Sequence, residues 1–445
     1  MKIFCIPLVV LLMHAASAQT TPADSAMLTN IYNEVLANGQ CYDDLHHLCK
    51  EIGHRLAGSE GAAKAIEWGE LRLWECEPDS VFLMPVEVPH WTRGTNEYAH
   101  YVANDYVDNG MMEPMKFSVA MTALGGSVGT GGEITAQVVE VKSFDELKAL
   151  GEEKVKGKIV FFNKAMDPML INTGAAYGGA YPIRGKGPSE AARYGAVACI
   201  IRSLTLADDN YPHTGGTIYN DSLPKIPAVA LSAVASRQLS QHLEQDPELL
   251  FTLHLSATAY PRTVQANVIA ELRGTDFPDE YITIGGHLDS WDIGEGAHDD
   301  GAGIVQSIEV MRTLVVLGYK PRHTIRVVLF INEEFGNDGG QTYADSCAAQ
   351  NLIHVAALES DAGGFTPMGF HCQCNDVQLK RFQSWKPLLE KFSLYDIKRG
   401  GSGVDIGPLR KEDTDRVALF GMRVDGQKYF NYHHSGNDIF ENVDK

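Results

Sequence analysis

Hydrophobic positions in the second half of the chain alternate between short β-type runs and one helical stretch. Four apolar, β-branched runs predict strands, at 266–272, 281–286, 324–331 and 354–358. Residues 303–317 predict a helix, because Ile304, Ile308, Met311 and Val315 recur at helical spacing. This order of elements predicts an α/β fold with a mixed, largely parallel central sheet that is flanked by helices.

The first half of the chain has two different textures. Residues 27–52 carry apolar side chains at helical spacing and predict one or two helices. The stretch 120–259 is instead rich in glycine and in short β-type runs, at 134–141, 158–162, 195–201 and 228–232. We therefore expect an inserted, mostly β domain at 120–259, which divides a catalytic domain into residues 19–119 and 260–445.

Composition and charge exclude some classes of protein. The 445 residues include 37 basic and 57 acidic side chains, which gives a formal net charge of −20. Hydrophobic residues make up 44% and charged residues 21%, as in ordinary globular proteins, and this excludes a disordered chain. Phosphate binding needs a basic footprint, so the acidic excess argues against a nucleic-acid partner.

The N-terminus predicts export. Residues 1–18 read MKIFCIPLVVLLMHAASA, with one lysine, an apolar run and a small-x-small cleavage site. A membrane anchor is the alternative, but the run is shorter than the ~20 residues that span a bilayer. We expect a cleaved signal peptide and a mature chain, secreted or periplasmic, without a membrane span.

Seven cysteines follow residue 18, an odd number that is small for this length. A chain this long can stabilise itself by its own core, so a disulfide framework is not needed. One or two bridges stay open at this stage. Cys372 and Cys374 form a lone C-x-C pair, which is weak as a metal motif, and we expect structural cysteines.

Histidine, aspartate and glutamate recur directly after the predicted strands. The segments are 285–303 with His287, Asp289, Asp299 and Asp300; 331–336 with Glu333 and Glu334; 359–364 with Glu359 and Asp361; 400–409 with Asp405; and 432–438 with His433, His434 and Asp438. Each segment alone could be a turn or a solvated face. Ligand sites of α/β folds lie at the carboxyl ends of strands, so recurrence there predicts a site. Carboxylates gathered with imidazoles need a counter-charge, and this mixture suits zinc.

With these motifs the chain resembles the M28 zinc exopeptidases, and within them the carboxypeptidase Q branch. The resemblance extends from LHHLCKEIGHRLAGS at 45–59 to YFNYHHSGND at 429–438. In 120–259 it also covers VKGKIV at 155–160 and YPHTGG at 211–216, which are similar to the protease-associated domain of that branch. It implies the zinc exopeptidase fold with a protease-associated insertion.

The resemblance also implies a role for each site residue. Two zinc ions per chain would share Asp299, followed by a cis peptide bond. The other implied roles are His287 and Asp361 on one zinc ion, Glu334 and His434 on the other, Asp289 orienting His287, and Glu333 as general base. His433 would be an oxyanion donor or a packing neighbour of the ligands. The implied activity is hydrolysis of dipeptides or short peptides by a metal-activated water.

Four matters stay open from the sequence. A glutaminyl cyclase-like acyltransferase and a catalytically inactive binding relative share the fold and are the alternatives to a peptidase. The specificity could be that of an aminopeptidase, a carboxypeptidase or a dipeptidase. Arg399, Arg423 and Lys428 could read a substrate carboxylate or be surface charges. Whether the chain forms a homodimer is also open.

Overall fold

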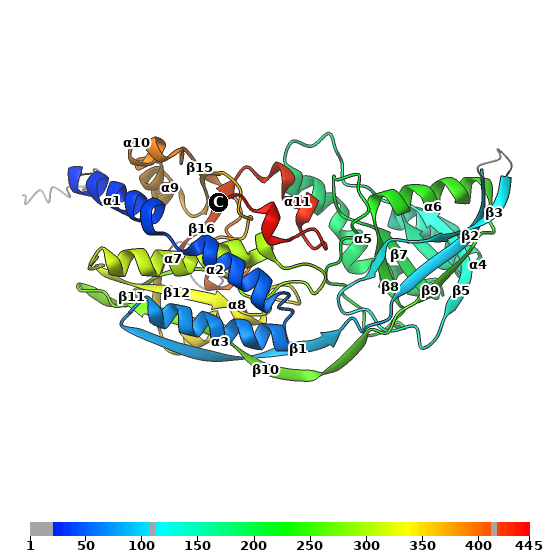
Figure 1. The fold of residues 1–445 in the computed structure, drawn as a ribbon, viewed down its shortest axis with the longest axis horizontal. Helices are drawn as coiled ribbons and strands as arrows, with labels where there is room; N and C mark the ends of the chain where they lie inside the picture. The colour runs from blue at the N-terminus through cyan, green and yellow to red at the C-terminus, as the bar shows by residue number, and fades with distance from the viewer. Residues whose placement is uncertain (1–20, 107–111, 411–415) are drawn as a thin grey trace, which may run out of the picture.

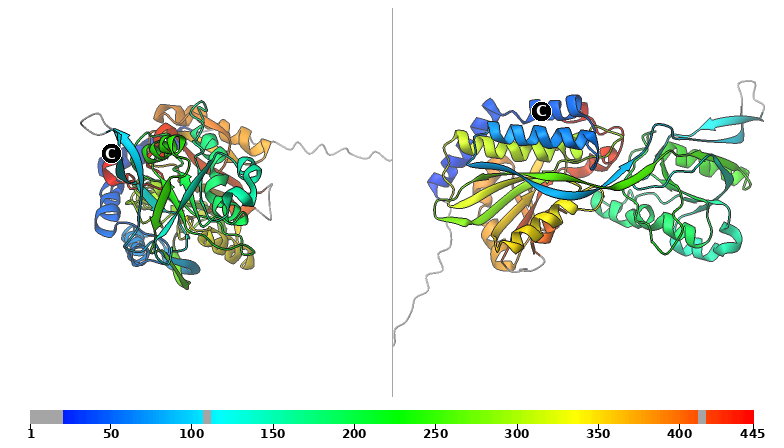
Figure 2. Two further views of the ribbon diagram at one scale, coloured as in Figure 1. Left: turned by 90° about the vertical axis from the view of Figure 1, so that its right-hand side faces the viewer. Right: turned by 90° about the horizontal axis from the view of Figure 1, so that it is seen from below.

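The computed structural model describes residues 21–106, 112–410 and 416–445. The expected signal peptide at 1–18 lies outside these residues. The chain forms two lobes that lie side by side, each built on an eight-stranded sheet (Figures 1 and 2). Strands β1 (Ser80–Thr92) and β10 (Thr258–Leu272) form a long antiparallel ribbon that runs from the first lobe toward the second.

The first lobe contains a mixed sheet whose four central strands are parallel. Its order is β1, β10, β12 (His323–Phe330), β11 (Phe277–His287), β13 (Ile353–Glu359), β16 (Ala418–Val424), β14 (Pro367–Gln373) and β15 (Asp396–Arg399). The neighbours β12, β11, β13 and β16 pair in parallel register. This arrangement confirms the predicted α/β fold, and each of the four strands predicted in this lobe overlaps an observed one, although 324–331 extends one residue past β12.

Helices cover both faces of this sheet (Figure 2). The helices and helical turns of the lobe are α1 (Pro22–Asn38), α2 (Cys41–His47), η1 (Leu48–Ile52), α3 (Glu60–Glu75), η2 (Ala297–Gly301), α7 (Ala302–Val316), α8 (Asp338–Ala349), α9 (Asp376–Gln383), α10 (Lys386–Leu389), η3 (Glu390–Phe392), η4 (Gly407–Arg410), η5 (Gly426–Lys428), α11 (Tyr429–Tyr432) and η6 (Phe440–Asn442). The two predicted helical stretches correspond to α1 through η1 and to α7.

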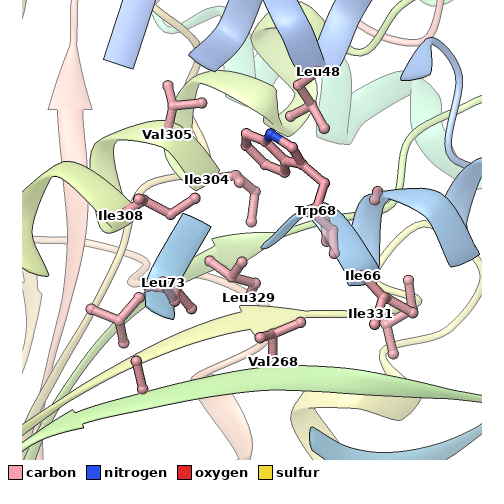
Figure 3. Close-up of a cluster of buried hydrophobic side chains, with 14 of the residues drawn as sticks. Leu48, Ile66, Trp68, Leu73, Val268, Ile304, Val305, Ile308, Leu329 and Ile331 are labelled. Atoms are coloured by element: carbon pink, nitrogen blue, oxygen red, sulfur yellow. The ribbon is translucent and has the colours of Figure 1, made fainter. Parts of the chain in front are cut away.

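The core of the first lobe follows the alternation of β12. Val327 and Leu329 point toward α2, α3 and α7, in the cluster that includes Leu48, Ile66 and Ile304 (Figure 3). Val328 and Phe330 point to the opposite face, where Tyr343 and Cys347 of α8 pack. Because both faces are buried, the strand is apolar throughout, as is typical of central parallel strands.

The second lobe has its own sheet and three helices. Its order is β3 (Met112–Ser118), β2 (Tyr98–Tyr106), β9 (Leu250–His254), β5 (Ile134–Val141), β6 (Ile159–Phe162), β7 (Ala198–Arg202), β8 (Ala228–Leu231) and β4 (Met121–Ala123). The helices are α4 (Phe144–Val155), α5 (Thr173–Arg193) and α6 (Ala233–Gln245).

The second lobe differs from the sequence expectation in two ways. Its sheet includes β2 and β3, which precede residue 120, the expected start of the inserted domain. The segment 120–259 is also more helical than the expected mostly β domain, because α5 alone has 21 residues. Helix α5 contains Pro182, Pro188 and several glycines, and its small residues pack closely: a Cβ at Gly187 would lie 3.2 Å from Phe162. Such a helix has no marked apolar periodicity to detect.

Two further expectations concern cysteines and membranes. The seven cysteines among the described residues are all free thiols, and Cys372 and Cys374 lie in a hydrophobic cluster of the first lobe. This agrees with structural cysteines rather than disulfides. Within the described ranges no helix is both long and apolar enough to cross a membrane.

Candidate metal centre

The predicted site residues gather where the parallel strands of the first sheet end. His287 is the last residue of β11, Glu333 and Glu334 follow β12, and Asp361 follows β13. Because parallel neighbours end at the same edge, the three loops converge there. The remaining residues come from η2, which contains Asp299, and from the segment after α11, which contains His433 and His434. The peptide bond between Asp299 and Asp300 is cis, as expected.

Asp299 joins two groups of potential metal ligands. Its Oδ1 lies 3.2 Å from His287 Nε2, and that nitrogen lies 3.8 Å from Asp361 Oδ1. Its Oδ2 lies 3.3 Å from His434 Nε2, and His434 Nε2 lies 2.9 Å from Glu334 Oε2. One aspartate thus presents one oxygen to each group.

His433 also reaches this centre. Its Nε2 lies 3.6 Å from Asp299 Oδ2, and its ring stacks on that of His434 with the centroids 3.5 Å apart. Asp299, His433 and His434 therefore form one set of closely spaced ligand atoms, and His287, Asp299 and Asp361 form another. The contact with Glu334 distinguishes His434 from His433 as the ligand of the second group.

The spacing and burial of these atoms fit divalent metal ions. Oxygen and nitrogen atoms that bind one tetrahedral zinc ion at 2.0–2.2 Å lie about 3.4 Å from each other, which is the spacing observed. His287 Nε2, Asp299 Oδ2 and Glu334 Oε1 are buried, and no hydrogen-bond partner is found for them among the described residues. Buried polar atoms are almost always satisfied, so these three atoms indicate a missing partner.

The charges of the centre also fit a bound metal ion. Burial, together with the charges of Asp361 and Asp299, raises the pKa of Glu333 to about 8. Burial also raises the pKa of Glu334 well above its ordinary value, and the charges of Asp299 and Glu333 add to this. Burial lowers the pKa of His434 well below its ordinary value, which keeps that imidazole neutral. Crowded carboxylates beside a neutral His434 are stabilised by a cation.

Asp289 organises the centre through the backbone. Its two carboxylate oxygens accept hydrogen bonds from the backbone N–H groups of Glu333, at 3.1 Å, and Glu334, at 3.3 Å. His287 Nδ1 lies 3.0 Å from the backbone oxygen of Asp289 and 3.8 Å from its carboxylate. Asp289 therefore contacts His287 mainly through its main chain, and its side chain holds the loop that carries the two glutamates.

Two further carboxylates of the motif segments, Asp438 and Asp300, hold loops. Asp438 accepts from the backbone N–H groups of His298 and Asp299. Asp300 accepts from the backbone N–H groups of His287 and Gly303. These side chains fix the backbone of the ligands rather than add further ligands.

Several neighbours of the centre were not predicted from the sequence. Trp291 Nε1 donates to Glu334 Oε2 at 2.6 Å. Arg184 of the second lobe is 4% exposed, and its Nη1 lies 3.2 Å from His434 Nδ1. His213, also of the second lobe, is buried, and its Nδ1 lies 2.6 Å from the backbone oxygen of His433. Trp291 lies within the HLDSW segment and could have been suspected, whereas nothing in the sequence links residues 184 and 213 to 433–434.

The fold and the centre together define a class of protein. An α/β sheet that presents closely spaced, buried histidines and carboxylates at its strand ends is the architecture of a metal-dependent hydrolase. Residues 267–445 match peptidase family M28.

Similar proteins cover almost the whole chain. Carboxypeptidase Q of Xenopus laevis is 35% identical over 408 residues, which are 90% of this chain and 81% of that protein. Carboxypeptidase Q of Homo sapiens is 33% identical, over 92% of this chain and 82% of that protein. The chain therefore belongs to peptidase family M28 and is a hydrolase of the metallopeptidase class.

Solved structures confirm the fold. A peptidase M28 precursor from Shewanella amazonensis superposes with a TM-score of 0.87 at 31% identity, covering 94% of this chain and 92% of that one. A zinc aminopeptidase from Bacillus subtilis superposes with a TM-score of 0.63, covering 91% and 90% of the two chains. At 19% identity this second likeness shows the shared fold alone.

Proposed function

We propose that the protein is an exported exopeptidase that uses two zinc ions to hydrolyse dipeptides or short peptides. The observation that carries the proposal is Asp299, whose two oxygens face two separate sets of nitrogen and carboxylate ligands. Family membership and the shared fold of a zinc aminopeptidase support zinc as the metal. The number of ions rests on the two ligand sets.

The ligands would divide around Asp299. His287 and Asp361 would hold one zinc ion, and Glu334 and His434 the other. When bound, such a pair of cations polarises the scissile carbonyl and lowers the pKa of a water molecule. Three of the ligands are carboxylates, and together with Glu333 they would balance the charge of two dications.

Glu333 is the proposed general base. It lies next to the proposed ligand Glu334. The Asp289 carboxylate accepts hydrogen bonds from the backbone N–H groups of Glu333 and Glu334, which fixes the loop that carries both side chains. Glu333 would accept a proton from the attacking water and return it to the leaving amine. Its raised pKa, about 8 in the absence of metal, brings it nearer to the amine that it must protonate.

The developing oxyanion needs a hydrogen-bond donor. His433 is one candidate, because it lies beside the ligand His434 and burial keeps its pKa well below the ordinary value. Tyr429 is another: its hydroxyl lies 3.5 Å from Asp361 Oδ1, and burial raises its pKa, so it stays protonated. A neutral imidazole or a protonated phenol can donate at neutral pH.

The domain division and the export signal belong to the same proposal. Residues 1–18 would be removed on export, and 19–119 and 260–445 would form the catalytic domain, apart from β2 and β3, which pair within the second sheet. The segment 120–259, together with these two strands, would form the protease-associated insertion. The relatives named carboxypeptidase Q and the neighbours named aminopeptidase support action at a chain terminus. The names do not agree on which terminus is read.

The test combines metal counting with blocked peptides. Zinc content of residues 19–445 should approach two ions per chain, and a chelator should abolish hydrolysis of dipeptides until zinc is restored. Dipeptides and tripeptides blocked at either terminus then identify the terminus that is read. The variant Asp299→Asn should lose zinc and activity together. One zinc ion per chain, or a fully metallated Asp299→Asn protein, would contradict the shared-ligand arrangement.

A further inference from the structure

A large cavity opens onto the proposed metal centre. It has a volume of about 750 Å3 and lies between strands β14, β15 and β16 of the first lobe and residues 171–173 of the second. Asp361 and Tyr429 line one end of it. Because Asp361 is one of the proposed zinc ligands, a peptide bound at the zinc ions would extend into this cavity.

One face of the three outer strands forms the wall of the cavity. In the strand register His371 pairs with Lys398, and Gly369 pairs with both Asp396 and Arg423, so these side chains share a face. The opposite face carries Phe370, Cys372, Ile397 and Phe420, which pack with α9 in a hydrophobic cluster. The alternation therefore places polar and basic side chains toward the cavity.

The basic charge on this wall is only partly neutralised. Lys398 Nζ lies 3.2 Å from Asp396 Oδ2, and Arg423 Nη1 pairs with the same oxygen. Two cations thus share one carboxylate, which leaves a net charge of about +1. The Lys398 side chain is 47% exposed and that of Arg423 is 21% exposed, so both can accept a further anionic partner.

The two carboxylates that also line the cavity have partners of their own, and Asp361 is one of the proposed zinc ligands. The carboxylate of Glu359, which also lines the cavity, accepts the backbone N–H groups of Val404 and Ile406. Burial lowers the pKa of His371, and the positive charges of Lys398 and Arg423 lower it further, which is the response expected of a titratable group in a positive field. Arg399 differs, because it pairs with Asp376 and donates to the backbone oxygen of Cys374.

We infer that Lys398 and Arg423 form a subsite that binds a carboxylate group of the substrate. The inference rests on the proposed peptidase function and specifies its substrate: a short peptide with a carboxylate near the scissile bond. That carboxylate is either the free C-terminus or an acidic side chain. Charge-assisted hydrogen bonds from lysine and arginine to a carboxylate supply affinity and orientation.

Turnover of three dipeptides tests the subsite. The zinc-loaded protein is assayed with Ala-Ala, Ala-Ala-amide and Ala-Glu-amide, alongside Lys398→Met and Arg423→Met. We expect a carboxylate to raise kcat/KM by about 10- to 100-fold over Ala-Ala-amide, and each variant to lose most of that ratio, because its kcat/KM falls far more on the carboxylate substrate than on the amide. If the protein prefers Ala-Ala over Ala-Ala-amide, the subsite binds the free C-terminus. If it prefers Ala-Glu-amide over Ala-Ala-amide, the subsite binds an acidic side chain.

The control is Lys380→Met, which removes a charge from α9 on the opposite side of the strands and should keep the wild-type ratio. Zinc content and melting temperature of every variant establish that the centre is intact. The inference is overturned if wild type shows no preference for a carboxylate, if both variants keep the preference, or if they lose activity equally on all three dipeptides.

Equilibrium binding separates the subsite from the peptidase function. Calorimetry should show that N-acetylalanine, which has a free carboxylate, binds more tightly than N-acetylalaninamide. N-acetylglutamic acid α-amide tests in the same way whether an acidic side chain is bound. The preference should weaken in Lys398→Met and Arg423→Met, whereas a carboxylate bound directly to zinc would be unaffected by them. If no dipeptide is hydrolysed, the peptidase proposal fails and this binding result decides the subsite.

Discussion

Two adjacent glutamates at the end of β12 are assigned different tasks. Glu334 Oε2 lies 2.9 Å from His434 Nε2 and belongs to a ligand set, whereas Glu333 is the proposed base. Replacing Glu333 by glutamine removes the proton acceptor but leaves every ligand. We expect Glu333→Gln to keep its zinc content and to lose about 10²- to 10⁴-fold in kcat. Steady-state kinetics and metal analysis of the same preparation measure both quantities.

The matched control is the neighbouring residue. Glu334→Gln changes the same functional group one position along, yet it weakens a ligand, so zinc content should fall together with activity. If Glu333→Gln also lost zinc, or kept its turnover, Glu333 would not be the base.

At the residue scale the sequence predicted which side chains gather at the centre, but not the contacts that support them. The proximity of His287, Asp299, Glu334, Asp361 and His434 could be predicted because each follows an apolar strand or belongs to a motif, whereas their roles as ligands came from the family resemblance and remain a proposal. The backbone contact between His287 and Asp289 could not be predicted, because its form depends on how the loop turns. The contact of Trp291 with Glu334 depends in the same way on the path of the loop after β11.

At the element scale, one buried side chain holds the loop between β11 and η2. Arg55 is fully buried, and its guanidinium donates to the backbone oxygens of Leu288, Gly53, Glu295 and Gly296. Lysine cannot satisfy four acceptors in this fork geometry. Arg55→Lys should lower the free energy of unfolding by about 2–4 kcal/mol, measured by urea denaturation of the zinc-loaded protein.

An exposed arginine provides the comparison. Arg262 pairs with Glu87 and Asp338 at the surface, so Arg262→Lys should cost less than about 1 kcal/mol. Equal effects of the two substitutions would show that the carbonyl contacts of Arg55 do not stabilise the loop.

A second prediction concerns the element that carries His433 and His434. The second lobe contacts the backbone carbonyls of both histidines. His213 Nδ1 lies 2.6 Å from the backbone oxygen of His433, and the backbone N–H of Thr214 donates to the backbone oxygen of His434 at 2.8 Å. His434 has a positive φ of 60°, a conformation uncommon outside glycine, so its backbone needs such support. His213→Ala should therefore weaken zinc binding by about 10- to 100-fold.

The control for His213 lies in the same lobe. His254 Nδ1 also contacts a backbone oxygen, that of Gly132 at 3.2 Å, but its ring stacks on Tyr98 rather than against the segment that carries His433 and His434. Competition with a zinc chelator should give wild-type affinity for His254→Ala. Unchanged zinc affinity in His213→Ala would mean that the second lobe does not support the ligand loop.

The element scale also shows where pattern reading stops. Four strands of the first sheet, β10 to β13, could be predicted because they contain continuous apolar runs, and α7 because its periodicity is clear. The other four, β1, β14, β15 and β16, were not predicted. Helix α5 could not be predicted, since prolines and glycines obscure its period. Strand β2 belongs to the second sheet because it pairs with β9, which lies more than 140 residues later in the chain, and β3 belongs to it because it pairs with β2. No local sequence pattern encodes these pairings.

At the scale of the whole molecule the site lies between two lobes. The first lobe supplies every proposed zinc ligand, and the second supplies Arg184 and His213 against the two histidines and residues 171–173 against the cavity. The sequence predicted an insertion at 120–259 but left its role open. These contacts support an insertion that completes the active site rather than one that only covers a distant face.

The crowding of carboxylates gives the whole molecule a testable pH dependence. In the metal-free protein the pKa of Glu333 is raised to about 8, from 4.5 in an unfolded chain. The folded state then binds a proton that the unfolded state has released, so stability falls as pH rises toward 8. Buried histidines such as His213, whose pKa is lowered to about 4, act in the opposite direction, but only below their unfolded value of 6.5.

In the window from pH 7 to 8.5 the histidines with lowered pKa values no longer contribute, whereas the folded state holds protons on Glu333 and on His287, whose pKa is also raised, that the unfolded chain has released. Across it we expect the free energy of unfolding of the zinc-stripped protein to fall by about 1 kcal/mol for Glu333 alone. The fall should be smaller in Glu333→Gln, and bound zinc should reverse it, because the cations favour the ionised carboxylates. Urea denaturation at several pH values, with and without zinc, measures these curves. A zinc-stripped protein that gains stability over this window would show that the carboxylates are not crowded as the structure places them.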